Sequence, residues 1–148
     1  MNIKPYTLKP FFRIFLATIL FSVLGCEGYK HPNLPNVWVN FWIYPNDANN
    51  DGLILWGGHM YFTGGVNGVV VYRLNESEFR AYDRACPHDW DDEDEPRVGV
   101  EDDGITLKCE KCGSLYNILD GGVISGPSRY ALKYYKTKYD GMRLRVHS

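Results

Sequence analysis

The chain has 148 residues, 45% of them hydrophobic and 15% aromatic, which suffices for one domain with a packed core and hardly for two. Its formal net charge of −2 gives no indication of nucleic-acid binding, which would want a basic face. It contains no phosphate-binding loop, no Ser-His-Asp arrangement and no paired carboxylate pattern, so we do not expect it to catalyse hydrolysis or phosphoryl transfer by itself.

The first 26 residues have the pattern of an export signal. Three basic residues precede the apolar run IFLATILFSVL at 14–24, which is too short to span a membrane, because a spanning helix needs about 20 residues. The following VLGC resembles the lipobox of bacterial lipoproteins, which implies that Cys26 is lipidated and anchors the mature chain in the bacterial cell envelope, periplasmic or surface-exposed. An ordinary signal peptide or an N-terminal anchor is the alternative. No Arg-Arg pair precedes the run, which favours export of an unfolded chain.

The rest of the chain has the pattern of an all-β domain. Residues 27–36 contain two prolines and two asparagines and are typical of a short tether. Short runs rich in β-branched and aromatic residues follow, separated by Gly, Asn and Asp, and no segment has a helical period. Asp140-Gly141 marks a closing hairpin. We expect a sandwich or small barrel with strands over 37–43, 53–56, 59–62, 69–74, 78–84, 105–109, 131–139 and 142–148.

The cysteines indicate a site with soft ligands. If Cys26 is lipidated, Cys86, Cys109 and Cys112 remain, and an odd number cannot form a closed set of disulfides. Cys86-x-His88 and Cys109-x-x-Cys112 are separated by 20 residues, and each pair follows a predicted strand. Thiolate and imidazole ligands suit iron–sulfur clusters, zinc or copper(I), and they do not suit calcium or magnesium.

The motifs around these ligands resemble Rieske-type iron–sulfur domains, in particular those of ring-hydroxylating-oxygenase ferredoxins. The similarity runs over about residues 70–148 and includes CPH at 86–88, CGSLYN at 112–117, DGG at 120–122 and SGPS at 125–128. It implies a Rieske-like antiparallel β-sandwich over 37–148, with a small subdomain at about 84–128 whose two loops hold a 2Fe–2S cluster. The implied ligands are Cys86, His88, Cys109 and Cys112.

The resemblance also implies roles for residues beside the ligands. Gly113 allows a tight turn, and the Gly126-Pro127 loop covers the cluster. The hydroxyl groups of Ser114 and Tyr116 would donate to sulfur and raise the reduction potential.

Cys112 departs from the family, which has histidine at this position. A third thiolate would lower the reduction potential from the Rieske range of about −150 to +300 mV toward the all-cysteine value near −400 mV. The chain also lacks the disulfide of cytochrome-complex Rieske proteins, because Lys111 and Asp91 stand at those positions. Structural zinc, or a Cys109–Cys112 disulfide in a degenerate fold without metal, are the alternatives. Export of an unfolded chain disfavours a cluster assembled in the cytoplasm, whereas Ser114 and Tyr116 favour a cluster.

The expected function is one-electron transfer by a component that is not itself an enzyme. The segment 89–103 contains nine acidic residues and one basic residue, so it would dock a basic redox partner or would simply be a solvated loop. The other class that we consider is a structural or binding lipoprotein with a degenerate Rieske fold. Neither reading includes nucleic acid as a partner.

Overall fold

The computed structural model describes residues 31–148. The predicted signal segment 1–26, with Cys26, and the first residues of the predicted tether lie outside the described residues. Within 31–148, no helix has the length and apolar character needed to cross a membrane.

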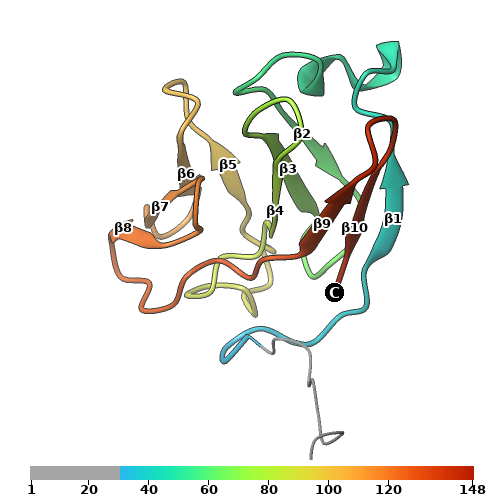
Figure 1. Cartoon of the computed structure of the whole chain (residues 1–148). Coiled ribbons are helices and arrows are strands. Elements are labelled where there is room, and N and C mark those ends of the chain that lie inside the picture. The colour runs from blue at the N-terminus through green and yellow to red at the C-terminus, as the bar shows by residue number, and fades with distance from the viewer. Residues whose placement is uncertain (1–30) are drawn as a thin grey trace, which may run out of the picture.

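The domain consists of three antiparallel sheets and one short helix, which confirms the predicted all-β class (Figure 1). The only helix of the described part is the 3₁₀ helix η1 (Ala48–Leu53). The first sheet has the order β1-β10-β9, the second β2-β3-β4 and the third β5-β6-β7-β8. The strands are β1 (Asn40–Ile43), β2 (His59–Phe62), β3 (Val69–Arg73), β4 (Phe79–Asp83), β5 (Val98–Val100), β6 (Thr106–Cys109), β7 (Leu115–Asn117), β8 (Val123–Ser125), β9 (Lys136–Tyr139) and β10 (Leu144–His147).

Strand β3 is buried on both faces, and this explains its nearly continuous apolar sequence, VVVYR. Successive side chains of a strand point to opposite faces. Val69 and Val71 therefore pack into one core with β1, β9 and β10, while Val70 and Tyr72 pack into a second core with β5, β6 and β7. The first core joins the two sheets of a sandwich, and the second attaches the four-stranded sheet, which forms a lobe beside the sandwich in Figure 1.

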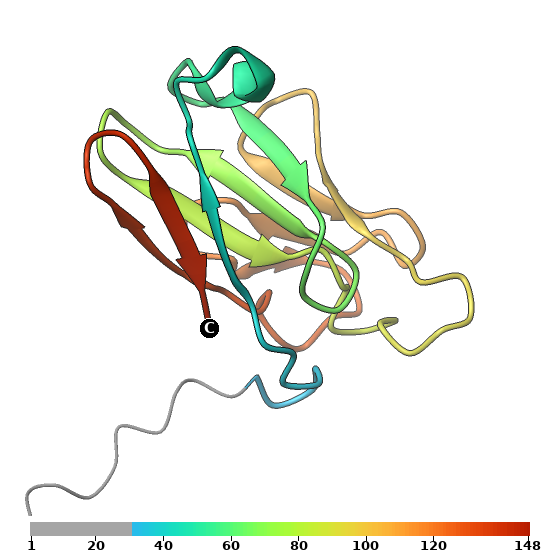
Figure 2. The ribbon, with the colours of Figure 1, turned by 90° about the vertical axis from the view of Figure 1, so that its right-hand side faces the viewer.

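The second core contains the side chains of Cys86 and Cys109, both fully buried. They pack with Val98, Leu107, Tyr116 and Ile118 at the junction of the sandwich and the lobe. In Figure 2 the connection from β4 to β5, coloured yellow-green to yellow, projects from one side of the molecule. The candidate site therefore has an apolar inner wall formed by the core, and an outer side formed by loops.

Asp83, the last residue of β4, fixes the chain three residues before Cys86. Its carboxyl group is fully buried and satisfied by four hydrogen bonds, as a buried polar group requires. The donors are the Val66 amide at 2.7 Å, the Asn67 amide at 3.2 Å, the Ala85 amide at 2.9 Å and the Tyr135 hydroxyl at 2.6 Å.

The strands predicted over 37–43 and 131–139 are shorter in the structure, as β1 (Asn40–Ile43) and β9 (Lys136–Tyr139). Two further parts of the predicted strand pattern differ more strongly. The strand predicted over 53–56 is wrong, because Leu53 ends η1 and the next three residues form an exposed turn. The Asp47 carboxylate accepts a hydrogen bond from the Asn49 amide at 2.8 Å and caps the helix, so local capping overrides the strand propensity of the apolar run. The three-residue strands β5, β7 and β8 were not predicted, because a period of two cannot be recognised over three residues.

Candidate metal centre

The first ligand loop follows β4 directly. Ala85 forms an isolated antiparallel bridge with Arg97, and a tight turn follows in which the Asp89 amide donates to the Cys86 carbonyl at 3.1 Å. The Asn33 side-chain amide donates to the Pro87 carbonyl, and His31 Nε2 lies 2.7 Å from the Ala131 carbonyl. The described end of the predicted tether thus lies against the loop that carries Cys86 and His88.

The second ligand loop begins where β6 ends, at Cys109. The Cys109 amide donates to the Ser114 carbonyl at 2.9 Å, and the Gly113 amide donates to the Cys109 carbonyl at 3.1 Å. Gly113 has φ of +71°, a conformation that strongly favours glycine, so its identity allows this turn. The loop places Cys109 in the core and Cys112 at a partly buried position.

The two loops bring three of the four predicted ligands together. The Sγ atoms of Cys86, Cys109 and Cys112 and a carboxylate oxygen of Asp89 all lie within 4.8 Å of one another. The Sγ atoms of Cys86 and Cys112 are 3.6 Å apart, and Cys109 Sγ lies 3.5 Å from Asp89 Oδ2. The cysteines of the described part, 31–148, are free thiols.

His88, the fourth predicted ligand, lies outside this group. Its side chain is 42% exposed, and its Nδ1 is 2.7 Å from Asp89 Oδ1. Asp89, the next residue, points its other oxygen toward the thiols and is only 7% exposed. In the sequence, Asp89 is simply the first residue of the acidic segment 89–103, and a ligand role was not predicted for it. The available signal was its position directly after a C-x-H motif.

Residues of the CGSLYN and SGPS motifs surround the thiols. Tyr116 Oη lies 3.3 Å from Cys86 Sγ, and the Cys112 thiol donates to Ser114 Oγ at 3.1 Å. Ser114 is fully buried and also accepts a hydrogen bond from the Ser128 amide at 3.0 Å. The Gly126-Pro127 loop is therefore connected to the thiols through Ser114.

Gly126 allows that loop to approach Ser114 closely. Gly126 has φ of +107°, and a Cβ atom there would lie 2.6 Å from Ser114 Cα and 2.8 Å from Ser114 Oγ. We expect G126A to lower the free energy of unfolding by about 1–3 kcal/mol more than G141A, because it adds a steric clash to the backbone strain. G141A is the matched control, since Gly141 has φ of +94° and nothing within 4 Å of its Cβ position. Urea denaturation measures both, and equal losses would contradict the close approach.

Burial controls the protonation of the site. It raises the pKa of the Cys109 thiol and, less strongly, that of Cys112, because both thiolates would be poorly solvated. Burial alone would raise the pKa of Asp89, but hydrogen bonds from Cys112, His88 and Cys109 lower it below the ordinary value. Cys109 and Cys112 therefore keep their protons until a cation replaces them.

The donor set fits a thiophilic metal centre. Three thiols and a carboxylate face one another. Within residues 31–148, no lysine or arginine forms a hydrogen bond or ion pair with Asp89. Three ionised sulfurs here would need a compensating positive charge, which a bound metal supplies.

Lys111 connects the second ligand loop to the acidic segment 89–103. Its Nζ lies 3.0 Å from a carboxylate oxygen of Asp92 and 3.0 Å from one of Asp94. All three side chains are substantially exposed, so these ion pairs contribute little to stability. They link the two ligand loops.

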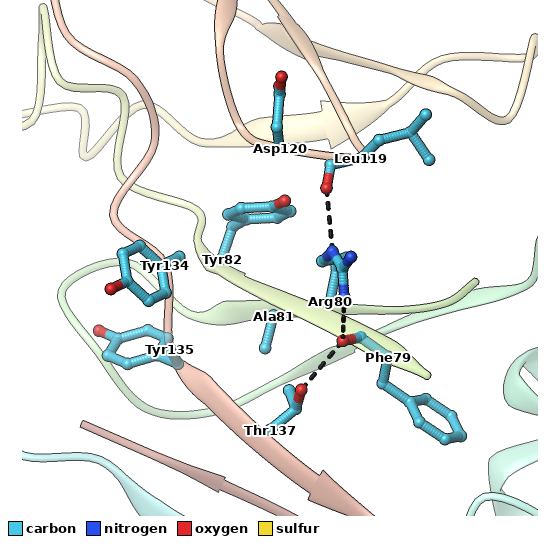
Figure 3. A pocket seen from close by; sticks show the side chains of 9 residues that line it. All are labelled: Phe79, Arg80, Ala81, Tyr82, Leu119, Asp120, Tyr134, Tyr135 and Thr137. Atoms are coloured by element: carbon cyan, nitrogen blue, oxygen red, sulfur yellow. Dashed lines mark hydrogen bonds between the residues drawn. The ribbon is translucent and has the colours of Figure 1, made fainter. Parts of the chain in front are cut away.

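Two of the pockets in residues 31–148, both outside the thiol group, lie on the ligand-loop lobe or next to it. One, of about 260 Å³, lies between β4 and the turn after β7 (Figure 3). There Arg80 Nε donates to the Leu119 carbonyl at 2.9 Å and Thr137 Oγ1 donates to the Phe79 carbonyl at 2.9 Å, and its lining includes no cysteine or histidine. The other, of about 560 Å³, adjoins the ligand loops and is lined by Asn33, Pro87, His88, Pro127, Arg129 and Tyr130.

Together, the fold and the site define a β-sandwich protein with an attached metal-binding lobe, in which two cysteine-bearing loops face each other. The Rieske [2Fe-2S] domain model matches residues 56–136, more than half of the chain, and the chain belongs to this family. This confirms the resemblance found in the motifs. The cofactor of this family is a 2Fe–2S cluster, and the three convergent cysteines supply the soft thiolate ligands that such a cluster takes.

Solved structures with a similar fold include two from carbazole dioxygenase systems. The ferredoxin of carbazole 1,9a-dioxygenase from Nocardioides aromaticivorans IC177 is 15% identical, with 62% of this chain and 86% of that chain covered and a TM-score of 0.45. A chain from a complex of reduced oxygenase and oxidized ferredoxin in carbazole 1,9a-dioxygenase is 20% identical. The match covers 72% of this chain and 92% of that chain, with a TM-score of 0.49.

A third similar structure is a proposed NADH-dependent nitrite reductase small subunit from Mycobacterium tuberculosis. It is 15% identical, and the match covers 76% of this chain and 97% of that chain, with a TM-score of 0.46. No curated protein matches the sequence.

Proposed function

We propose that this protein is an electron carrier of the bacterial cell envelope, anchored through a lipidated Cys26, which transfers one electron at a time through a 2Fe–2S cluster. The observation that carries the proposal is the convergence of Cys86, Cys109 and Cys112 within a Rieske domain. The protein itself would be a redox component, and a separate catalytic protein would carry out any chemistry on a substrate.

In the proposed ligand assignment, Cys86 and Cys109 bind one iron, and Cys112 and His88 bind the other. His88 would have to turn its ring away from Asp89 to do so, and its 42% exposed side chain leaves room for this movement. When bound, the cluster supplies a one-electron couple. The protein contributes an apolar inner wall of core residues and places the hydroxyl groups of Tyr116 and Ser114 next to the sulfurs of Cys86 and Cys112.

The proposed partner is a basic redox protein that docks on the acidic segment 89–103. This segment begins in the first ligand loop, so a partner bound there would lie close to the cluster. Opposite charges would speed association, and added salt would slow it. The competing proposal, a structural or binding lipoprotein, would keep the fold around zinc or a Cys109–Cys112 disulfide.

An anaerobic reductive titration of the native protein tests electron transfer directly. We expect reversible bleaching of visible absorption with one electron taken up per chain, and re-oxidation by a basic protein acceptor that slows as salt is added. A colourless protein that takes up no electron would favour the structural alternative.

Tyr116 is expected to raise the reduction potential through its contact with Cys86. Once Cys86 binds metal and has lost its proton, the Tyr116 hydroxyl, 3.3 Å from its sulfur, becomes the donor. This hydrogen bond stabilises the more negative, reduced state, so Y116F should lower the potential. The expected shift is about 40 mV, taking about 1 kcal/mol for the hydrogen bond and about 59 mV per tenfold change for one electron. Protein-film voltammetry measures this shift.

Y82F is the matched control for this prediction, because Tyr82 lies in the same core and is likewise almost fully buried. We expect its potential to stay within a few millivolts of the unmodified protein. Equal shifts in Y82F and Y116F would show that the effect comes from core packing and not from the hydroxyl contact.

A further inference from the structure

We infer that this site can also bind a single divalent ion of the Zn²⁺ type with tetrahedral geometry, as a second mode of metal loading. The ligands in this mode are Cys86, Cys109, Cys112 and Asp89. Asp89, and not His88, is the fourth ligand in this mode. The inference goes beyond the proposed electron transfer and does not rest on it.

The distances between the donors match a single tetrahedron. With zinc–sulfur bonds of about 2.3 Å and zinc–oxygen bonds of about 2.1 Å, tetrahedral angles separate two sulfurs by about 3.8 Å and a sulfur from an oxygen by about 3.6 Å. The corresponding observed values are 3.6 Å between Cys86 Sγ and Cys112 Sγ and 3.5 Å between Cys109 Sγ and Asp89 Oδ2. All the other separations within the group stay below 4.8 Å.

This arrangement is more compact than a cluster requires. In the proposed cluster assignment Cys86 and Cys112 bind different irons, so the path between their sulfurs runs through two metal atoms. Two sulfurs bound to different irons must lie farther apart than two sulfurs bound to the same tetrahedral ion. Cys86 Sγ and Cys112 Sγ are 3.6 Å apart, which is about the separation expected on one ion. The loops as they stand therefore fit one ion, and cluster loading requires Cys86 and Cys112 to move apart.

Asp89 is positioned as a ligand by three contacts. Its amide donates to the Cys86 carbonyl at 3.1 Å, which fixes the turn. His88 Nδ1 holds Oδ1 at 2.7 Å, while Oδ2 faces Cys109. A ligating carboxylate is ordinarily oriented by such an outer hydrogen bond, and His88 supplies it here. Within residues 31–148, this buried carboxylate forms no ion pair with a lysine or arginine. A divalent ion would supply the missing positive charge.

The test uses the full chain in mild detergent, stripped of metal and kept reduced, and titrated with Co²⁺ and then Zn²⁺. We expect one ion per chain, a tetrahedral Co²⁺ spectrum with thiolate charge-transfer bands, and zinc-edge X-ray absorption showing three sulfurs and one light atom without imidazole scattering. D89N should weaken Zn²⁺ binding about tenfold or more, whereas the exposed control D91N should leave it unchanged.

H88Q identifies the fourth ligand. We expect its zinc-edge spectrum to keep the same coordination shell as the unmodified protein. Imidazole scattering in the unmodified protein that disappears in H88Q would overturn the assignment, as would a D89N variant with unchanged affinity, or no binding of one ion per chain. Iron and sulfide are measured on separately reconstituted samples. Failure of cluster loading would count against the proposed electron transfer and would leave the zinc result standing.

Discussion

C109S is expected to reduce the iron and sulfide of the reconstituted protein to background and to abolish its visible absorption. Cys109 is fully buried at the end of β6, and its Sγ lies 3.5 Å from Asp89 Oδ2. A serine hydroxyl is a poor ligand for soft metals and stays protonated. Metal analysis and absorption spectra of the variant measure this loss.

A81S is the matched control for C109S. Ala81 is also nearly fully buried, in β4, and serine there adds a hydroxyl to the other core without touching the thiols. Both variants should lose about 1–3 kcal/mol of stability without metal, since both bury a hydroxyl. Only C109S should lose the cofactor. A C109S protein that keeps two irons per chain would show that Cys109 is not a ligand.

C112H is expected to raise the reduction potential by about 100 mV or more, toward the range of clusters with two histidine ligands. A neutral imidazole in place of a thiolate removes one negative charge from the ligand set, which makes electron uptake easier. The additional imidazole should also make the potential fall more steeply with rising pH, because the reduced centre holds a proton that the oxidised centre loses. Voltammetry between about pH 6 and 10 measures both effects.

E110H provides a control that is matched in charge and side chain. Glu110 is exposed in the same loop, so this variant also removes one negative charge and adds one imidazole, but it leaves the thiols in place. Screening by solvent should keep its shift to a small fraction of the C112H shift. Similar shifts in the two variants would contradict a ligand role for Cys112.

The sequence predicted the parts of the molecule in which local pattern and burial agree. The run at 69–74 identified the doubly buried strand β3, and the Cys86-x-His88 and Cys109-x-x-Cys112 motifs identified both ligand loops. The resemblance to Rieske domains predicted roles for Ser114, Tyr116 and Gly126, and these residues lie beside the thiols. Each of these features is determined by a few residues that are close in the sequence, so it can be predicted from one sequence.

Asp89 could not be predicted in the same way. It belongs to an acidic segment whose other members are mostly exposed, and acidic residues are rarely buried unless they are paired. Its burial follows from the turn at Cys86 and from the approach of the second loop, which are tertiary contacts. The strand wrongly predicted at 53–56 failed for a related reason, because the capping of η1 by Asp47 decided the local structure.

The most direct test of the proposed electron carrier is the metal content of the protein recovered from the native cell envelope. Iron, sulfide and zinc are determined per chain, and an EPR spectrum is recorded after reduction with dithionite. We predict about two irons and two sulfides, with a rhombic signal whose average g value lies below 2. A protein without iron or sulfide, holding one zinc ion or a Cys109–Cys112 disulfide, would contradict electron transfer and leave the Rieske fold as a structural or metal-binding scaffold.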